Sequence, residues 1–362
     1  MQRVTEEAGL RVSLGTGTPL SYADVCSSKC IDDKVFAKGR RSNDKQLHSV
    51  MRITIIGGTG HVGTYLVPML VEAGHEITCV SRSLRQPYQA HASWKRVTMV
   101  QIDRLASEST NRFGKEILAL QPEVVIDMIC FEPGSAKHLH EHLNGRIQQL
   151  VHCGTMWVHG HSVQVPVRED APRKPFGDYG IAKAAIEKFL LDEHRASGFP
   201  ATILHPGHIV GPGWVPLNPA GNFNPAVFKK LKNGEELVLP NIGMETVHHV
   251  HARDVAQAFL LAVANPAQAI GENFHVVSPA ALTLRGYAEL MADWFGKPLR
   301  LSFLPWGEWK NTVSENDAAM TWDHIAHSPN GSIEKARRML HYNPEYASIE
   351  AVQESVLAMT LT

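Results

Sequence analysis

Residues 53–63 read Ile-Thr-Ile-Ile-Gly-Gly-Thr-Gly-His-Val-Gly, a short apolar run followed at once by a glycine-rich turn. The run predicts a buried strand, and glycine suits a turn that needs positive φ and close approach of the backbone to a pyrophosphate. The first N–H groups of a helix beginning near residue 60 would point at the phosphates. A purely structural turn is the alternative, but a strand, turn and helix that open the first βαβ unit predict dinucleotide binding. The predicted cofactor contacts here are Gly57, Thr59, Gly60, His61, Val62 and Gly63.

Downstream of this turn, apolar runs alternate with helical patterns. Strands that are buried on both faces and joined by helices imply a parallel, doubly wound sheet, so the predicted fold is α/β of the Rossmann type. The predicted strands cover residues 53–56, 77–80, 97–102, 124–129, 150–153, 202–204 and 273–277. The predicted helices cover residues 60–73, 110–120, 134–143, 179–197, 254–264, 284–295 and 333–340.

The chain divides into three predicted parts. Residues 1–50 are rich in Ser, Lys, Arg and Asp without a sustained period, which predicts a flexible extension; a tag, an upstream start before Met51 and a functional arm are the alternatives. Residues 51–205 are the predicted NAD(P)-binding Rossmann domain. Residues 206–362 are mainly a smaller substrate-binding lobe, which opens with a stretch rich in Pro, Gly and Asn up to about residue 245 and returns to the sheet at about 250–280.

Composition limits the classes of partner. The 362 residues carry a formal net charge of -1, which gives no reason to expect nucleic acid or a membrane surface. No apolar run approaches the roughly 20 residues that span a bilayer, and the N-terminus lacks the pattern of a secretory signal. Three of the five cysteines, Cys79, Cys130 and Cys153, lie in apolar runs, as buried thiols of a reducing compartment do. We expect a cytoplasmic protein that acts on a small molecule.

The end of the second strand bears on the choice of cofactor. An acidic residue there would bind the ribose 2′-hydroxyl of NAD, but the chain has Ser81 and Arg82, which could hold the 2′-phosphate of NADP. Arg82 could instead be a solvated cation or stack on adenine. The sequence therefore favours NADP, with NAD as the alternative. Asp103, after the third strand, could reach the adenine amino group.

Tyr179 and Lys183 form a YxxxK spacing, which on a helix places a phenol and an ammonium on one face. The pKa of a phenol is about 10, and lowering it to about 7 needs roughly 4 kcal/mol of differential stabilisation of the phenolate. A nearby lysine and the positive ring of an oxidised nicotinamide are suited to supply it. Taken alone, the spacing fits equally well two side chains on the exposed face of a surface helix.

Further motifs accompany this pair in a fixed order, and together they resemble the NAD-dependent epimerase/dehydratase family, the extended short-chain dehydrogenases, over nearly everything from Met51 onward. Residues 57–63 match the family's GxxGxxG, residues 150–160 resemble its strand and SSxxVYG loop, residues 179–183 match YxxxK, residues 205–213 resemble RxxNVxGPG, residues 250–256 resemble VHVDDVA, and residues 335–344 resemble KAxxxLGWxP.

The resemblance implies specific roles. Tyr179 would be the general acid/base, Lys183 would hold the nicotinamide ribose hydroxyls and assist Tyr179, and Thr155 would hydrogen-bond the substrate oxygen. His205, at the start of its motif, is also expected at the cofactor. The resemblance further implies a homodimer built on the helices at 134–143 and 179–197.

Departures from the family pattern narrow the reaction. Met156 and Trp157 stand where family dehydratases carry an Asp-Glu pair, and Val247 stands where sugar-nucleotide epimerases place an arginine. We therefore expect an NAD(P)-dependent oxidoreductase that transfers hydride at a carbonyl or secondary alcohol of a neutral or smaller substrate. The alternatives are a redox-neutral sugar or sugar-nucleotide epimerase and, from another class, a non-catalytic NAD(P)-binding sensor or RNA-associated protein.

The chain has 20 histidines, which raises the question of a metal. Residues 138–142 fit HxxEH, a pattern of some zinc peptidases, but the resemblance places them on an exposed or subunit-facing helix, so no metal is predicted. His248, His249 and His251 form a second cluster, in which the first would point opposite to the other two. The predicted substrate contacts are Met156, His208, Asn222 and His249.

Overall fold

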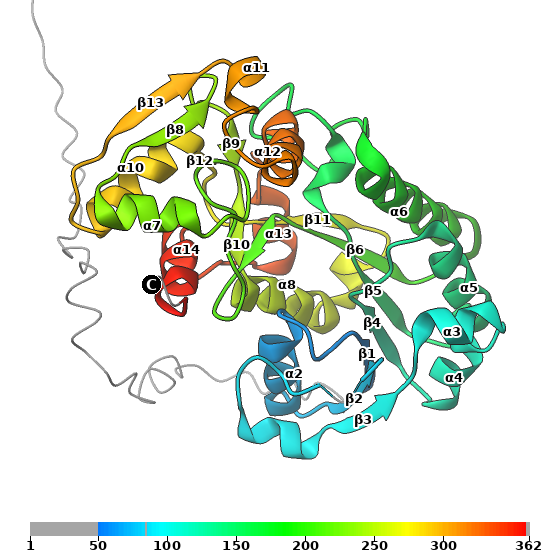
Figure 1. Cartoon of the computed structure of the whole chain (residues 1–362). Helices are drawn as coiled ribbons and strands as arrows, with labels where there is room; N and C mark the ends of the chain where they lie inside the picture. The colour runs from blue at the N-terminus through cyan, green and yellow to red at the C-terminus, as the bar shows by residue number, and fades with distance from the viewer. Residues whose placement is uncertain (1–49, 84, 360–362) are drawn as a thin grey trace, which may run out of the picture.

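The structure is a computed structural model that describes residues 50–83 and 85–359 (Figure 1). The predicted extension at residues 1–50, with Cys26 and Cys30, therefore lies outside the described residues except for Val50. No helix among the described residues is both long and apolar enough to cross a membrane.

Seven parallel strands form the central sheet, in the order β3-β2-β1-β4-β5-β6-β11. Successive residues such as Val125 and Ile126 of β4 are both buried, because the sheet is covered on both faces. The predicted doubly wound α/β fold is confirmed, and each predicted strand is present. The strands are β1 (Arg52–Ile56), β2 (Glu76–Ser81), β3 (Thr98–Gln101), β4 (Val124–Asp127), β5 (Gln149–Cys153), β6 (Ala201–Pro206) and β11 (Asn273–Val276).

Helices cover the two faces of this sheet (Figure 1). One apolar core joins the sheet to α2 (Gly63–Glu72), α8 (Ala252–Ala264) and α13 (Glu334–Leu340). The core on the other face joins it to α4 (Phe113–Ala119), α5 (Pro133–Leu143) and α6 (Gly177–Ser197). The remaining helices of this part are α3 (Arg104–Ser109), α9 (Pro266–Ala269) and the 3-10 turns η2 (Ala92–Arg96) and η3 (Met156–His159).

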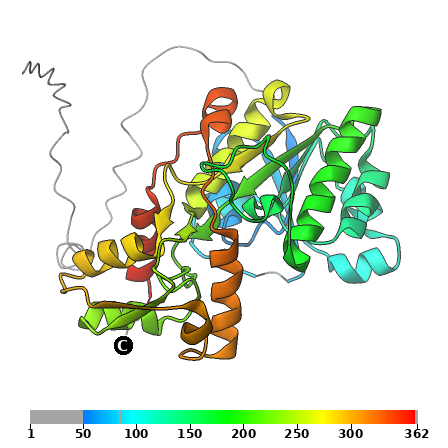
Figure 2. The ribbon, with the colours of Figure 1, turned by 90° about the horizontal axis from the view of Figure 1, so that it is seen from above.

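A third apolar core forms a second lobe, which lies to one side of the sheet (Figures 1 and 2). Its strands are β8 (Leu237–Pro240) and β13 (Leu301–Leu304), which pair in parallel. Its helices are α7 (Ala226–Asn233), α10 (Leu284–Trp294), α11 (Trp306–Trp309), α12 (Glu315–His327) and α14 (Ser348–Leu357). Short pairs connect the parts: β7 (His208–Val210) with β10 (His249–His251), and β9 (Thr246–Val247) with β12 (Leu282–Thr283).

The stretch between residues 206 and 245 is more regular than its composition indicates. It contains β7, α7 and β8, none of which was predicted from the sequence. Helix α7 has only eight residues and buries Val227, Phe228 and Leu231 before Gly234 ends it at φ 69°. Helix α7 makes only about two turns and lies among prolines and asparagines. Its apolar period is therefore too short to be recognised in the sequence. The division of the chain at residues 205 and 206 stays a proposal. Elements α8, β11 and α13 follow this boundary in the sequence but belong to the core of the sheet.

Candidate active site

The glycine turn connects β1 to α2 with a backbone that excludes side chains. Gly57 has φ 88°, and a Cβ there would lie 2.8 Å from Ile129 Cγ2 in the loop after β4. A Cβ on Gly63 would lie 1.8 Å from the carbonyl oxygen of Gly58, so only glycine fits. No described side chain caps α2, and its first turn holds no acidic residue. The turn therefore presents a helix N-terminus at close range, which suits a pyrophosphate.

This turn lies where the strand order reverses. Strand β1 pairs with β2 on one side and β4 on the other, so the loops that follow β1 and β4 diverge at the carboxyl edge of the sheet. In open α/β sheets this switch point is where a dinucleotide binds. The residues present fit a nicotinamide dinucleotide, whose pyrophosphate the turn at Gly57–Gly63 would hold.

The residues after β2 can reach the adenosine end of such a cofactor. Arg82 is exposed directly after the strand, whereas Ser81 is buried and its hydroxyl donates to the carbonyl oxygen of Ser83 at 2.7 Å. Arg85 lies on the same loop with its guanidinium 4.9 Å from the ring of Tyr88. The hydroxyl of Tyr88 accepts a hydrogen bond from Trp214, so this loop is tied to the loop after β7.

Asp103 has a structural contact at the carboxyl end of β3. Its carboxylate accepts the backbone N–H of Ala106 at 3.1 Å and caps α3, although the residue stays exposed. The adjacent Arg104 is buried and donates to both carboxylate oxygens of Asp127, at 2.8 and 3.0 Å. This ion pair fixes the end of β4 beside the cofactor edge, and the sequence analysis did not find it.

Thr155, Tyr179 and Lys183 come together beyond the carboxyl ends of β4 and β5. Lys183 is 1% exposed, and its ammonium donates to the carbonyl oxygens of Cys130 and Cys153, each at 2.7 Å. The same ammonium lies 5.9 Å from the ring centroid of Tyr179. The hydroxyl groups of Tyr179 and Thr155 lie close enough for Thr155 to influence the pKa of Tyr179.

Burial controls the protonation of this set. It raises the pKa of Tyr179 to about 12, with Cys153 adding to the rise and Thr155 opposing it. The residue as a whole is 42% exposed. Burial also lowers the pKa of Lys183. Tyr179 is thus a protonated phenol at neutral pH, ready to donate, and it needs nearby positive charge to act as a base.

His205 lies behind the loop that carries Thr155 and is fully buried. Its Nδ1 accepts the backbone N–H of Thr155 at 3.0 Å. Because Nδ1 accepts this hydrogen bond, a ring proton lies on Nε2, which is 3.2 Å from Glu187. In the structure His205 supports the loop that carries Thr155.

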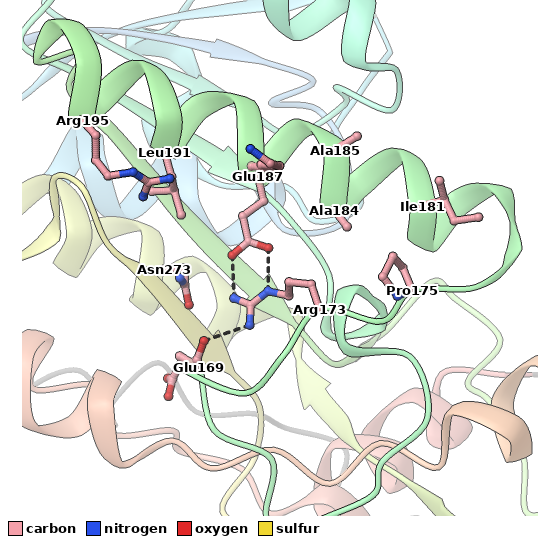
Figure 3. Close-up of a pocket in the computed structure, with 11 residues that line it drawn as sticks. Glu169, Arg173, Pro175, Ile181, Ala184, Ala185, Glu187, Leu191, Arg195 and Asn273 are labelled. Carbon is pink, nitrogen blue, oxygen red and sulfur yellow. Dashed lines mark hydrogen bonds and ion pairs between the residues drawn. The ribbon is translucent and has the colours of Figure 1, made fainter.

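Glu187 is held from its other side by Arg173 (Figure 3). The guanidinium donates to both carboxylate oxygens of Glu187, at 3.0 and 2.6 Å, and to the backbone carbonyl of Glu169 at 2.9 Å. Burial disfavours the charge of Glu187, but His205 and Arg173 together hold its pKa below the usual range. This network lines a surface cleft of about 430 Å³ beside α6.

A separate pocket of about 520 Å³ opens at Thr155, Tyr179 and Lys183. Two predicted substrate residues, Met156 and His208, line it. Asn222 lies outside its lining and hydrogen-bonds to Thr321 at 3.1 Å, and His249 also lies outside, with Nε2 3.1 Å from the carbonyl oxygen of Leu217. The alternation of the strand turns His248 toward the pocket instead.

Sequence reasoning missed several other lining residues, mostly from loops and from α12. Ser314 accepts the backbone N–H of Asp317 and caps α12, so a serine three residues before an acid was a usable start signal for that helix. No pattern marked which of its side chains face the pocket. The missed lining residues include Phe131, Phe223, Met320, Asp323 and His324.

The HxxEH residues lie on α5, and their ligand atoms fall within 4.8 Å of one another. His138 Nε2, however, accepts the backbone N–H of Gly114 at 2.9 Å, and His142 Nδ1 lies 2.9 Å from the carbonyl oxygen of His138. Two of the four imidazole nitrogens are thus engaged by the backbone. We assign no metal to this group.

The fold and the site define a Rossmann-type enzyme of the extended short-chain dehydrogenase/reductase superfamily. Residues 53–276 match the model of the NAD dependent epimerase/dehydratase family, and the chain belongs to that family. Known members similar to it include epimerases, dehydratases and a reductase, and the chain is an NAD-dependent enzyme.

The proteins that are similar to this chain have names that state different activities. The chain is 24% identical over 316 residues to the chloroplast stem-loop binding protein of 41 kDa b of Arabidopsis thaliana, covering 85% of this chain and 79% of the relative. It is 24% identical over 285 residues to the 2'-dehydrokanamycin reductase of Streptomyces kanamyceticus, covering 78% of each. A solved UDP-glucose 4-epimerase of Thermotoga maritima, with UDP-glucose, has a TM-score of 0.65 at 20% identity and covers 85% of this chain and 98% of that one.

Proposed function

We propose that the protein is an NADP-dependent oxidoreductase that interconverts a carbonyl and a secondary alcohol. The observation that carries the proposal is the set of Thr155, Tyr179 and Lys183 at one end of a mainly apolar pocket. Met156 and Trp157 follow Thr155 and line the same pocket, and neither can move a proton for β-elimination.

Each residue has a defined part in the reduction of a carbonyl. A reduced nicotinamide, when bound at this edge, would supply the hydride. Tyr179 donates its proton to the substrate oxygen, and Thr155 holds that oxygen by a hydrogen bond. Lys183, anchored by the carbonyl oxygens of Cys130 and Cys153, stabilises the phenolate that remains. In the reverse direction Tyr179 is the base, which its raised pKa disfavours until positive charge is nearby.

The cofactor, the assembly and the compartment belong to the same proposal. The exposed Arg82 and the lack of an acid after β2 support NADP over NAD. The resemblance supports a homodimer on α5 and α6, and the unpaired buried thiols of Cys79 and Cys130 are in keeping with a cytoplasmic protein.

A redox-neutral epimerase is the second candidate, because UDP-glucose 4-epimerases recur among the similar proteins. An epimerase returns the hydride to its substrate, so it consumes no net reduced cofactor. Against it, no arginine is present among the described residues that line the pocket, where a diphosphate would need one.

The test is a screen of neutral and charged ketones, aldehydes and secondary alcohols with each cofactor, followed by the absorbance of the reduced nicotinamide. We expect net oxidation of NADPH with at least one carbonyl compound. Epimerisation of a sugar nucleotide without net cofactor turnover would contradict the proposal and support the second candidate. Tight cofactor binding with turnover of neither class would favour the non-catalytic alternative, and stem-loop binding by such a protein would match the name of the Arabidopsis relative.

A further inference from the structure

Helix α12 presents one face to the substrate pocket. Met320, Asp323 and His324 of this helix line the pocket, at the i, i+3 and i+4 spacing of one helical face. Asp323 is the one acidic side chain among the described lining residues, and it forms no ion pair with a described residue. Lys183 is the one cationic lining residue, and its ammonium is already held by two carbonyl oxygens.

Aromatic rings gather on the same side of the pocket. The ring of His324 lies 5.3 Å from Trp157, 5.6 Å from Phe223 and 5.2 Å from His208, measured between ring centroids. Four aromatic residues that line a pocket together with a carboxylate provide π faces and a counter-ion, the combination that binds organic cations.

The two histidines add no positive charge at neutral pH. Burial lowers the pKa of His324 to about 4, and burial followed by the nearby His324 and His249 lowers the pKa of His208 well below its usual value. Burial raises the pKa of Asp323. Asp323 is partly buried and has no ion-pair partner among the described residues, so a bound cation would offset the loss of hydration that raises its pKa.

We infer that the substrate of this enzyme carries a protonated amine or a quaternary ammonium, which Asp323 pairs with and which the rings of Trp157, Phe223 and His324 surround. This inference rests on the proposed function, because it takes the ligand of the pocket to be the substrate. A sugar nucleotide fits this pocket poorly, since its diphosphate would meet Asp323 and no lining arginine. The relevant carbonyl compounds are amino ketones and their alcohols, including amino sugars.

The test compares two ketones of nearly equal shape, (4-acetylphenyl)trimethylammonium and 4-tert-butylacetophenone. Their dissociation constants are measured by calorimetry on the full chain saturated with oxidised cofactor, so binding is read without turnover. We expect the cation to bind at least ten times more tightly than the neutral ketone. In Asp323→Asn the ratio should fall to about three or less through weaker binding of the cation alone, while Asp323→Glu should restore most of it.

Asp293→Asn, which removes an exposed acid from α10, is the matched control and should leave the ratio unchanged. Equal binding of both ketones by the wild type, or an undiminished ratio in a folded Asp323→Asn protein, overturns the inference. The two proposals fail separately. Turnover of neutral ketones without a preference for the cation refutes this inference alone, whereas a preference for the cation without turnover of any amino ketone or amino alcohol counts against the proposed function.

Discussion

At the scale of single residues, Arg82 is the side chain on which the choice of cofactor depends. It is exposed directly after β2, while the hydroxyl of Ser81 is already bonded to Ser83. Arg82→Ala should therefore weaken NADPH binding by about 1–3 kcal/mol, the range for a charge-assisted hydrogen bond, and leave NADH binding nearly unchanged. Fluorescence titration of both reduced cofactors gives the two affinities.

Lys297→Ala removes an exposed cation from the second lobe and serves as the control for a general loss of charge. Equal affinity of the wild type for NADH and NADPH would refute the preference. If Arg82→Ala weakens the binding of NADH and NADPH equally, the arginine binds a group that the two cofactors share.

Glu187 connects the ion pair with Arg173 to the ring of His205, which supports Thr155. Glu187→Gln keeps the shape and removes the charge, so we expect the free energy of unfolding to fall by about 1–3 kcal/mol, less than for a fully buried pair because Arg173 is partly exposed. We also expect a lower kcat with little change in cofactor affinity. Urea denaturation and steady-state kinetics measure the two effects.

Asp192→Asn on the same helix is the matched control, because Asp192 pairs with Lys188 and Arg195 at the surface and its loss should change stability little. If Glu187→Gln and Asp192→Asn behave alike, the buried network does not support the site as described.

Motif residues and pocket residues differ in how far the sequence predicts them. Gly57, Tyr179 and Lys183 were predicted because each belongs to a motif whose fixed spacing is visible in the sequence, and Thr155 was predicted from the family resemblance. His248 in place of His249, and Asp323 altogether, were not, because their position depends on how a loop or helix of the second lobe meets the sheet. That packing is a tertiary property without a local period.

At the scale of elements, the exposed ridge of α6 bears on assembly. Ile181, 52% exposed, and Ala185 lie one turn apart on this helix beside the cleft of Figure 3. If α5 and α6 form the proposed dimer interface, a charge at Ile181 would be buried without a partner. Ile181→Glu should therefore convert a dimer at micromolar concentration to a monomer, as measured by sedimentation velocity.

Val163→Glu places the same charge at an apolar residue that is 90% exposed and should leave the dimer intact. A wild-type protein that sediments only as a monomer would refute the proposed assembly. The strands of the sheet were predicted because each is an apolar run of sequence. Helices α7, α11, α12 and α14, all in the second lobe, were not predicted.

At the scale of the whole molecule, many buried histidines make stability depend on pH. Burial is the largest cause of the lowered pKa in each case, for example to about 4 in His248 and about 3 in His249. In the unfolded chain a histidine titrates near 6.5, so below that pH the unfolded state binds protons that the native state does not. Stability should therefore be full above about pH 6.5 and fall as the pH drops toward 4, by up to about 1.4 kcal/mol per pH unit for each such histidine.

Thermal unfolding between pH 7.5 and 5 checks this slope. His249→Gln retains a donor for the carbonyl of Leu217 but does not titrate, so it should reduce the slope by about one histidine. His341→Asn, at an exposed position, is the control. A melting temperature that stays constant over this range would contradict the neutral state of the buried imidazoles.

The central claim is that Tyr179 moves the proton in a hydride transfer, and one measurement tests it most directly: single-turnover oxidation of NADPH by Tyr179→Phe with a substrate found in the screen. The variant keeps the ring and loses only the hydroxyl, so the account predicts unchanged cofactor affinity and a rate lower by about 10²–10⁴. Thr155→Ser should stay close to the wild type because the hydroxyl survives, whereas Lys183→Ala should lose both rate and cofactor affinity. A Tyr179→Phe protein that oxidises NADPH at the wild-type rate would contradict the account.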